Sequence, residues 1–548
     1  MFKNLALSLL LCFSFFTSCA QQNIVDFIGE WEGKTTNKDA LNLDIIVKKL
    51  SEEDAVFTLS NNKEIITKKF KFDNRINLAL GDNLIFSGIV NDGQSEINGF
   101  MKSKRYLYPA KLYKRGDHFE GKWNLSVIHY LQPQSLRLTI KEGGGSDDEY
   151  RAYPILGNLW CNNFKKKNNS ISFTDSNTGL EFEGLLKPSE VVLNISLEGN
   201  FITKTSFKKI TKYKKTASID KNSQINDGWE LSKNGLVLQK MEEDIRNDSL
   251  VGIEGVLIAK NGKITYEKYF AGFNVNIPHG MRSASKSISS AIIGIAIDDK
   301  IIENVDKKLY DFIPQEYQYT KDALKSKITI KDLLTMSSGL DVNNKAYEEY
   351  YQESNNWLKT VLEAPMVKDP GTYADYGSAN PFLLGVYLSN RLDVPLEFYM
   401  ADKLFSPLGI TNYILNTDDT KAIPYFGGGF HLTPRDMLKF GQLYLNEGVW
   451  NSKRIISENW IRESFKKHTR LQDRRDKNEY GYLWWHDTYI INEEAITSIE
   501  ARGAGGQFIF IVPALESVVV ITAGNYRNRK GNQSREIFEE YILPVLLN

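Results

Sequence analysis

Residues 283–297 read Ser-Ala-Ser-Lys-Ser-Ile-Ser-Ser-Ala-Ile-Ile-Gly-Ile-Ala-Ile, and this stretch decides the fold of the second half of the chain. Small and apolar residues at this density predict a buried helix. Ser283 and Lys286 are three positions apart, which puts both side chains on one face of that helix. The stretch therefore predicts a helix that opens with a paired serine and lysine.

These two residue types have a chemical meaning when they lie together. A serine hydroxyl is a weak nucleophile until a neighbouring base takes its proton. A lysine serves as that base when its surroundings favour the neutral amine, and a helix N-terminus contributes to this. Ser283 and Lys286 are therefore a candidate nucleophile and base.

Spacing alone does not single out this serine. Five Ser-x-x-Lys tetrads occur in the chain, beginning at Ser60, Ser206, Ser218, Ser283 and Ser464. Only Ser283 stands between a predicted strand hairpin and a long helix of small residues, the context in which the motif works. The other four lie in β-rich segments, a linker or charged surface.

Predicted hairpins lie on both sides of this helix in the sequence. Residues 255–259 and 263–269 flank Asn261-Gly262, a dipeptide typical of a tight turn between antiparallel strands. Residues 508–512 and 517–522 are expected to pair in the same way. These segments predict an antiparallel sheet.

Helices are predicted between the hairpins. Thr433-Pro434-Arg435-Asp436 combines an N-cap, a first-turn proline and an acid at the third helical position. The 320 residues from Trp229 to Asn548 suffice for a substantial mixed core. We therefore predict an α+β domain over residues 229–548, an antiparallel sheet flanked by helices.

The first half of the chain has short alternating segments typical of strands. Gly29-Glu30-Trp31 recurs as Gly121-Lys122-Trp123, and Phe86-Ser87-Gly88 recurs as Phe182-Glu183-Gly184, at offsets of 92 and 96 residues. The recurrence predicts two all-β modules, over residues 23–117 and 118–213, with a chance match of common residues as the alternative. Polar, lysine-rich residues 214–228 predict a linker.

The first 22 residues have the pattern of a secretory signal peptide. Lys3 precedes an apolar run over residues 5–16, which is shorter than the ~18 residues that span a bilayer. Thr17-Ser18-Cys19-Ala20 resembles a bacterial lipobox, although Phe16 stands where Leu is usual. This resemblance implies lipidation of Cys19 and a lipoprotein of the bacterial cell envelope, on the periplasmic or outer-membrane side. A plain signal peptide with an incidental cysteine is the alternative.

Composition and residue spacing indicate which partners and cofactors to expect. Lys+Arg and Asp+Glu both number 68, so charge gives no reason to expect nucleic acid as a partner. The six histidines are scattered without metal-ligand spacing, and we expect neither a metal nor an organic cofactor. With Cys19 lipidated, Cys161 is the one other cysteine of the mature chain, which excludes an intramolecular disulfide.

Further motifs follow Ser283 in the order of a known family. Residues 328–340 read Ile-Thr-Ile-Lys-Asp-Leu-Leu-Thr-Met-Ser-Ser-Gly-Leu, similar to a Leu-Leu-x-x-x-Ser-Gly-Leu segment, with Met336 where His is common. Residues 370–378 read Pro-Gly-Thr-Tyr-Ala-Asp-Tyr-Gly-Ser, similar to Pro-Gly-x-x-Phe-x-Tyr-x-Asn. Residues 229–548 thus resemble the serine β-lactamase and penicillin-binding superfamily, specifically its class C β-lactamase-like esterase, amidase and D-aminopeptidase branch.

The resemblance implies roles for particular residues. Tyr376 aligns with the family's catalytic tyrosine, a general acid/base, while Ser378 replaces an asparagine. The third motif falls at Ala501-Arg502-Gly503, where the usual basic first residue is missing. Arg502 is expected either to bind a substrate carboxylate or to form a structural ion pair. Gly503 allows close approach to the substrate, and the backbone N–H groups of Ser283 and Ala504 are expected to form an oxyanion hole.

The predicted activity is a two-step acyl transfer on an ester, amide or peptide-like bond of a small molecule. Two alternatives stay open. One is a catalytically inactive family member that serves as a lipid-anchored binding or scaffold protein. The other, ranked lower because of Ala501 and Ser378, is a true β-lactamase or peptidoglycan carboxypeptidase.

Overall fold

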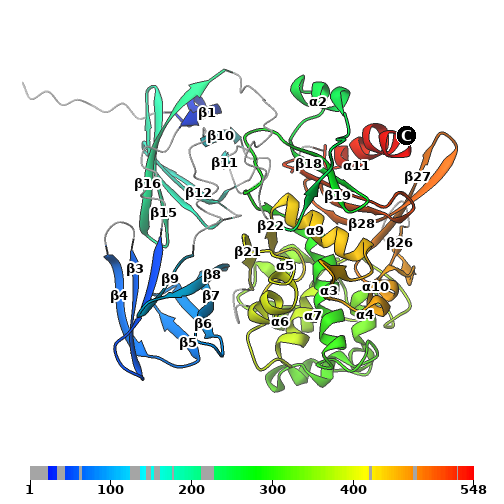
Figure 1. Cartoon of the computed structure of the whole chain (residues 1–548), viewed down its shortest axis with the longest axis horizontal. Coiled ribbons are helices and arrows are strands. Elements are labelled where there is room, and N and C mark those ends of the chain that lie inside the picture. The colour runs from blue at the N-terminus through cyan, green and yellow to red at the C-terminus, as the bar shows by residue number, and fades with distance from the viewer. Residues whose placement is uncertain are drawn as a thin grey trace, which may run out of the picture.

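A computed structural model describes most of the chain. The described residues are 23–33, 43–60, 64–123, 136–142, 150–153, 161–175, 178–211, 227–418, 423–472, 478–526 and 529–548. The predicted signal and lipobox region, including Cys19, lies outside them, and so do residues 212–226, which include most of the predicted linker 214–228. A β-rich N-terminal half stands beside a mixed C-terminal half (Figure 1).

The C-terminal half is built on a nine-stranded sheet with the order β17-β19-β18-β30-β29-β28-β27-β26-β25. The two predicted hairpins are its β18–β19 and β29–β30 pairs. Every pairing is antiparallel except that of β17 with β19. The strands are β17 (Glu230–Leu231), β18 (Ile253–Lys260), β19 (Lys263–Tyr269), β25 (Thr469–Arg470), β26 (Glu479–Tyr480), β27 (Trp485–Ile491), β28 (Glu494–Gly503), β29 (Gln507–Val512) and β30 (Ser517–Ala523).

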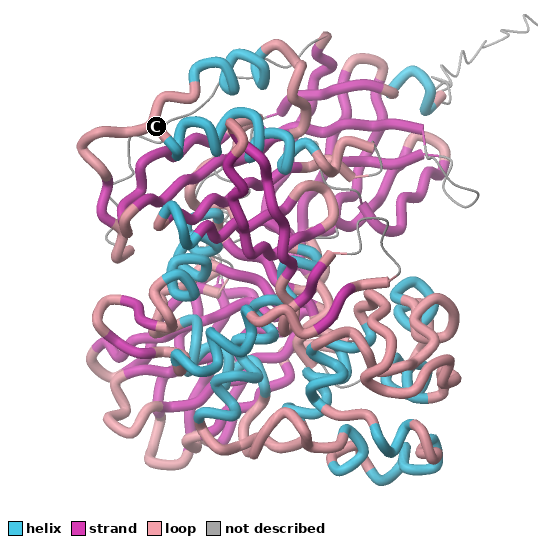
Figure 2. The backbone as a smooth tube through the Cα atoms, turned by 90° about the vertical axis from the view of Figure 1, so that its right-hand side faces the viewer, coloured by secondary structure: helices cyan, strands magenta, loops and turns pink. Residues whose placement is uncertain are grey.

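Helices cover both faces of this sheet (Figure 2). Along β18, Val256 and Ile258 face one core while Leu257 and Ala259 face the other, as alternation in a strand requires. The first core is closed by α2 (Gln239–Arg246), α11 (Gln533–Ile537), the π-helix η9 (Phe538–Ile542) and α12 (Leu543–Leu547). The second is closed by α9 (Pro434–Leu445). The predicted α+β sheet flanked by helices is confirmed.

Helix α9 begins where the sequence predicts. The Thr433 side chain accepts a hydrogen bond from the backbone N–H of Asp436 at 3.2 Å, and Pro434 occupies the first turn. Gly441 brings this helix close to β30, since a methyl group there would lie 2.5 Å from Val518 Cγ1. The helix is thereby fixed against the sheet.

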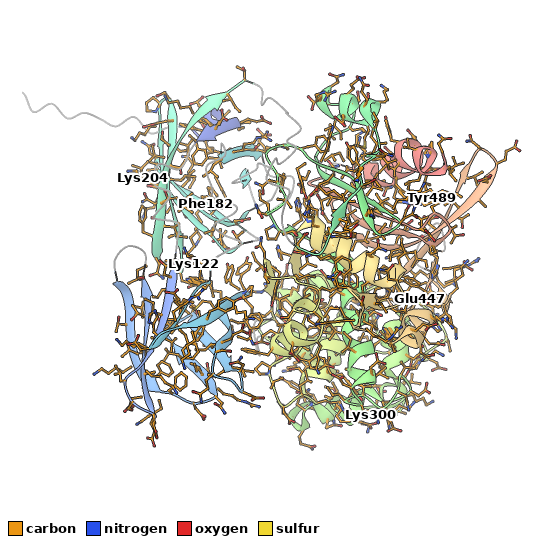
Figure 3. The ribbon with its side chains drawn as sticks, in the orientation of Figure 1. Lys122, Phe182, Lys204, Lys300, Glu447 and Tyr489 are labelled. Carbon is orange, nitrogen blue, oxygen red and sulfur yellow. The ribbon has the colours of Figure 1, made fainter. Side chains whose placement is uncertain are left out.

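The predicted helix after Ser283 is α3 (Ser285–Asp298), and it is buried from Ser285 to Ala296. It packs on α7 (Ala379–Ser389) within a layer of short helices next to the sheet. Side chains fill this layer, whereas the labelled Lys300 and Glu447 lie exposed (Figure 3). The other short elements of the C-terminal half are η3 (Arg282–Ala284), η4 (Leu309–Asp311), η5 (Gln315–Thr320), η6 (Lys325–Lys327), α4 (Ile330–Leu334), α5 (Glu348–Gln352), α6 (Trp357–Leu362), α8 (Leu396–Met400), η7 (Ala401–Phe405), β23 (Val449–Trp450), β24 (Lys453–Arg454), α10 (Glu458–Phe465) and η8 (Pro513–Leu515).

The N-terminal half forms two sheets, as an all-β prediction requires. Eight strands follow the order β11-β10-β1-β16-β15-β14-β13-β12, and β2 to β9 belong to a second, eleven-stranded sheet. The elements are η1 (Ile24–Phe27), β1 (Gly29–Gly33), β2 (Asp44–Lys49), β3 (Asp54–Ser60), β4 (Glu64–Lys71), β5 (Arg75–Ala79), β6 (Leu84–Val90), β7 (Glu96–Ser103), β8 (Tyr106–Arg115), β9 (His118–Lys122), β10 (Leu136–Glu142), β11 (Tyr150–Tyr153), β12 (Cys161–Lys167), β13 (Ser170–Asp175), β14 (Glu181–Lys187), β15 (Glu190–Leu197) and β16 (Asn200–Ile210).

The two strands that carry or adjoin the recurring Gly-x-Trp motif are exchanged between these sheets. Strand β1 pairs with β10 and β16, while β9 pairs with β2 and β8. Strand β1 of the first module therefore lies between β10 and β16, the first and last of the strands that form the rest of the second module's sheet. Strand β9 lies between β2 and β8 of the first module. Trp31 and Trp123 are both 2% exposed. The sheets do not divide at the predicted boundary between residues 117 and 118, because alternation predicts a strand but not its partner.

The eleven-stranded sheet continues from the N-terminal half into the C-terminal half. Strand β8 pairs with β21 (Tyr413–Asn416), which pairs with β22 (Phe430–Leu432), and β22 pairs with β20 (His279–Gly280). Phe100 and Phe398 pack edge to face across the same interface, with ring centroids 5.0 Å apart. The first β module is therefore joined to the C-terminal half by backbone hydrogen bonds and by a packed core.

Glu397 is buried on α8 beside Phe398, and burial raises the pKa of its carboxyl to about 7, a rise that Lys102 opposes. The pKa of the Glu397 carboxyl in the folded protein is above the unfolded value of 4.5. The stability that this carboxyl contributes is therefore fully present below pH 4.5. The contribution is lost as the pH rises through about 7, because the buried carboxylate must then ionise.

We expect Glu397→Gln to remove this pH dependence. Between pH 5 and pH 8, the wild type should lose on the order of 2 kcal/mol of unfolding free energy relative to the variant. Urea unfolding of both proteins at the two pH values measures the difference. Glu539→Gln, a change at an exposed carboxylate, should behave like the wild type. Parallel pH profiles of the wild type and Glu397→Gln would refute the assignment.

Candidate active site

Ser283 lies on η3, the short turn between β20 and α3, and its side chain is half-buried. The preceding residue, Arg282, has a φ of 51°, in the left-handed region that a non-glycine residue rarely adopts. Such backbone strain is often found at functional sites. The turn presents the Ser283 hydroxyl ahead of the helix rather than within it.

Lys286 lies fully buried on the first turn of α3 and contacts three separate segments. Its Nζ donates to Ser283 Oγ at 2.8 Å, to Ser378 Oγ at 3.0 Å and to the Gly427 carbonyl at 2.5 Å. The one nitrogen therefore lies within hydrogen-bond distance of three oxygens. The contact with Ser283 has the geometry of a nucleophile and its base.

Tyr376 stands over this lysine. The centroid of its ring is 5.1 Å from Lys286 Nζ, and Trp485 and Tyr480 pack against it at centroid distances of 5.1 and 6.3 Å. Trp484, from the same aromatic cluster of the sequence, is instead buried against Phe440. The structure thus brings together Ser283, Lys286, Tyr376 and Ser378, which the sequence separates by up to 95 positions.

The end of β28 packs against the Ser283 turn. A methyl group on Gly503 would collide with the Met281 carbonyl and lie 3.2 Å from the Ala284 nitrogen, so only glycine fits. Ala504 follows it in an exposed turn. Ala504, the predicted oxyanion-hole residue, therefore directly follows Gly503, which packs on the Ser283 turn.

Arg502 points into an ion-pair network. Its guanidinium contacts Glu500 and Asp487, each at 2.7 Å, and stacks over Trp485 at 4.9 Å. Arg535 also pairs with Asp487. Two carboxylates already neutralise Arg502, so the geometry favours the structural ion pair over the predicted binding of a substrate carboxylate.

The Gly427 carbonyl is the site group that sequence reasoning missed. Residues 427–429 are three successive glycines, and this triplet was the available signal of a close backbone approach. His431, which follows them, is buried on β22, and burial, then Arg282 and His279, lower its pKa to about 3. It is therefore a neutral histidine within the β22 core.

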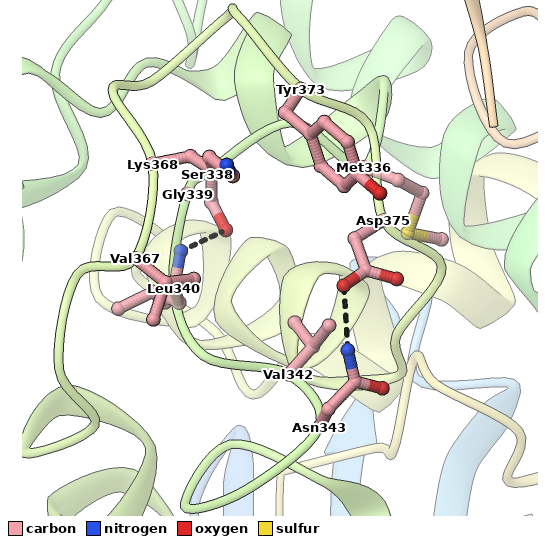
Figure 4. Close-up of a pocket in the computed structure, with 10 residues that line it drawn as sticks. All are labelled: Met336, Ser338, Gly339, Leu340, Val342, Asn343, Val367, Lys368, Tyr373 and Asp375. Atoms are coloured by element: carbon pink, nitrogen blue, oxygen red, sulfur yellow. Dashed lines mark hydrogen bonds between the residues drawn. The ribbon is translucent and has the colours of Figure 1, made fainter. Parts of the chain in front are cut away.

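A pocket of about 250 Å³ lies beside the Tyr376 segment (Figure 4). Asn343 Nδ2 donates to Asp375 Oδ2 at 2.8 Å across one side of it. Val342 lies against Gly377, since a methyl group there would be 2.9 Å from Val342 Cβ. The lining comes from the two motif segments after Ser283 and from residues next to them in the chain: Met336, Ser338, Gly339, Leu340, Val342, Asn343, Val367, Lys368, Tyr373 and Asp375.

Groups of metal ligands and membrane-spanning helices are both missing from the described part of the chain. Among those residues, no three or more His, Cys, Asp or Glu side chains form a group that could hold a metal ion. Within the same residues, none of the helices has the length and apolar character needed to cross a membrane.

A Ser-x-x-Lys pair at the start of a buried helix, beneath a tyrosine and next to an antiparallel sheet flanked by helices, defines a protein of the β-lactamase/transpeptidase fold. The sequence model of the Beta-lactamase family matches residues 239–538, more than half of the chain. The chain therefore belongs to the β-lactamase family, which confirms the resemblance seen in its motifs.

The chain is similar to a curated relative and to solved structures. A 6-aminohexanoate-dimer hydrolase of Paenarthrobacter ureafaciens is 21% identical over 289 residues, which are 49% of this chain and 71% of the relative. A putative 6-aminohexanoate-dimer hydrolase from Bacillus anthracis matches 59% of this chain and 85% of its own, with 21% identity and a TM-score of 0.47. A putative β-lactamase from Bacteroides dorei matches 52% and 89%, with 19% identity and a TM-score of 0.43. Family membership and the curated relative support a hydrolase.

We expect Gly503→Ala to disable the site, because the added methyl group must push β28 away from the Ser283 turn. A displacement of about 1 Å at such a site typically lowers the rate roughly 100-fold. Hydrolysis of an activated ester, with a thermal unfolding curve, measures the effect. Gly81→Ala, where a methyl group meets nothing within 4 Å, is the control. Equal activity in both variants would contradict the assigned contact.

Proposed function

We propose that the chain is a secreted, lipid-anchored serine hydrolase that cleaves an ester or amide bond through an acyl-enzyme on Ser283. The observation that carries this proposal is the 2.8 Å contact of Lys286 Nζ with Ser283 Oγ, below the face of Tyr376. A small ester, amide or peptide-like molecule is the proposed substrate. The family and its named hydrolases support the reaction type.

In the first step, Ser283 Oγ forms a bond to the carbonyl carbon while its proton passes to the Lys286 amine. Backbone N–H groups of Ser283 and Ala504 stabilise the oxyanion of the tetrahedral intermediate. Tyr376 relays a proton to the leaving oxygen or nitrogen as the carbon–heteroatom bond breaks. Ser283 then carries the acyl group.

In the second step, water attacks the acyl carbon, and its proton returns through Tyr376 and Lys286. The bond to Ser283 Oγ breaks, the hydroxyl regains a proton, and the acid product leaves. The pocket beside the Tyr376 segment, whose lining is part apolar and part polar, is the proposed place for one side of the substrate.

The alternatives make different predictions. A β-lactamase or peptidoglycan carboxypeptidase ranks lower because Ala501 supplies no positive charge and Ser378 stands in place of asparagine. Covalent labelling by a fluorescent penicillin would favour that alternative. A binding or scaffold protein would show no serine-dependent turnover.

We expect Ser283→Ala to abolish p-nitrophenyl acetate hydrolysis and the acyl adduct seen in the intact mass of the wild type. Loss of a triad-type nucleophile lowers kcat by on the order of 10⁶-fold, which takes the rate to background. Ser464→Ala is the matched control, because Ser464 opens another Ser-x-x-Lys tetrad and its hydroxyl donates to the Ile461 carbonyl. Equal turnover in wild type and Ser283→Ala, with no adduct, would favour the binding protein.

The proposed location is the bacterial cell envelope, with Cys19 lipidated. Cys19→Ala should lose incorporation of labelled fatty acid and partition with the soluble fraction, while it keeps the esterase activity of the released domain. Fractionation of cells that express both forms measures this. A Cys19→Ala variant that is still labelled and still membrane-bound would exclude the lipoprotein.

A further inference from the structure

The first β module reaches the candidate active site through the sheet that it shares with the hydrolase domain. Strand β8 of the module pairs with β21, and the following strands β22 and β20 lead directly into the Ser283 turn. Gly427, whose carbonyl accepts from Lys286, belongs to the described residues 423–429 that directly precede β22. The module is therefore attached to β21, the strand that pairs with β22.

Arg105 makes that attachment. Its carbonyl accepts from the Thr417 backbone N–H at 2.8 Å, and its Nε donates back to the Thr417 carbonyl at 3.3 Å. The guanidinium also lies 4.6 Å from the centroid of the Trp357 ring. A cation over a tryptophan face holds both groups in place.

Aromatic contacts continue from Trp357 to the glycine loop. Trp357 packs edge to face on Tyr425, with centroids 5.4 Å apart. The Tyr351 and Tyr425 hydroxyls share a hydrogen bond of 2.6 Å, which fixes the far end of the Tyr425 ring. Trp357 and Tyr425 are buried, so neither ring can move without moving its neighbours.

Tyr425 in turn holds the Gly427 carbonyl. A methyl group on Gly427 would lie 2.5 Å from Tyr425 Cζ, which shows how closely the backbone lies on the ring. The Gly429 N–H donates to the Tyr425 carbonyl at 2.9 Å and closes the turn. A shift of the ring would therefore move the carbonyl that accepts from Lys286 Nζ at 2.5 Å.

We propose that Arg105 of the N-terminal β module is a positioning residue for Lys286, acting through Trp357, Tyr425 and the Gly427 carbonyl. The module is then a structural part of the active site and not a spacer. This inference rests on the proposed function, because it gives Lys286 the role of base. The effect should fall on the chemical step rather than on substrate binding.

The test compares Arg105→Ala with Arg75→Ala, a matched variant across the same interface. Arg75 Nη1 donates to the Asp393 carbonyl at 3.0 Å, and the contacts named above do not include it. We expect Arg105→Ala to lower kcat roughly tenfold or more with KM within about twofold, and to shift the pH profile of kcat/KM. Arg105→Lys should recover part of the rate, because it keeps a cation over Trp357.

Arg75→Ala should keep the wild-type kcat and pH profile. Wild-type kcat and pH profile in Arg105→Ala would overturn the proposal, and so would an equal loss in Arg75→Ala, which would mean that any damage to the interface has the same effect. Thermal unfolding curves identify variants that lose activity by unfolding, and Arg105→Lys then provides the decisive rate.

A crystal structure of Arg105→Ala separates this inference from the proposed function. The proposal requires the Gly427 carbonyl to move away from Lys286 Nζ, whatever the turnover. An unchanged contact overturns the positioning role even when Ser283 is the nucleophile. A displaced carbonyl in a protein without Ser283-dependent turnover supports the contact chain and refutes the proposed function alone.

Discussion

The candidate site depends on one buried amine. Lys286 Nζ is the point at which the start of α3, the N-terminal end of α7 and the glycine loop before β22 meet, because Ser283, Ser378 and Gly427 each supply an acceptor. A buried lysine with an unfilled N–H would be costly, so the three segments must arrive together. The same requirement explains the close packing around them, with glycine at 427 and 503 where a methyl group would collide.

The arrangement extends beyond the hydrolase domain. The strand order β20-β22-β21-β8 makes the wall of the site and the first β module parts of one sheet. Within the N-terminal half, β1 and β9 each complete the sheet of the other module, so the two modules cannot separate without breaking backbone hydrogen bonds. Through the pairing of β8 with β21, the N-terminal half is thus joined to the sheet that contains β22, the strand directly after the glycine triplet.

Much of the hydrolase domain could be predicted from local patterns. Asn261-Gly262 and the alternating residues around it indicate the β18–β19 hairpin, and Thr433-Pro434 indicates the start of α9, because turns and caps depend on neighbouring residues alone. Ser283, Lys286 and Tyr376 followed from motif order. Arg502 shows the limit: its sequence neighbours left a substrate role and an ion pair equally open, and only the approach of Asp487 and Glu500 favours the pair.

The sequence by itself determined the family, the α+β sheet flanked by helices, the β-rich N-terminal half and the residues that could act as nucleophile, base and proton relay. Tertiary structure alone decided which strands exchange, that β8 extends a sheet of the hydrolase domain, and that the Gly427 carbonyl accepts from Lys286. The physical reason is the range of the interactions. Periodicity, capping and motif spacing act over a few residues, whereas strand partners and backbone acceptors are chosen by packing between segments far apart in the chain.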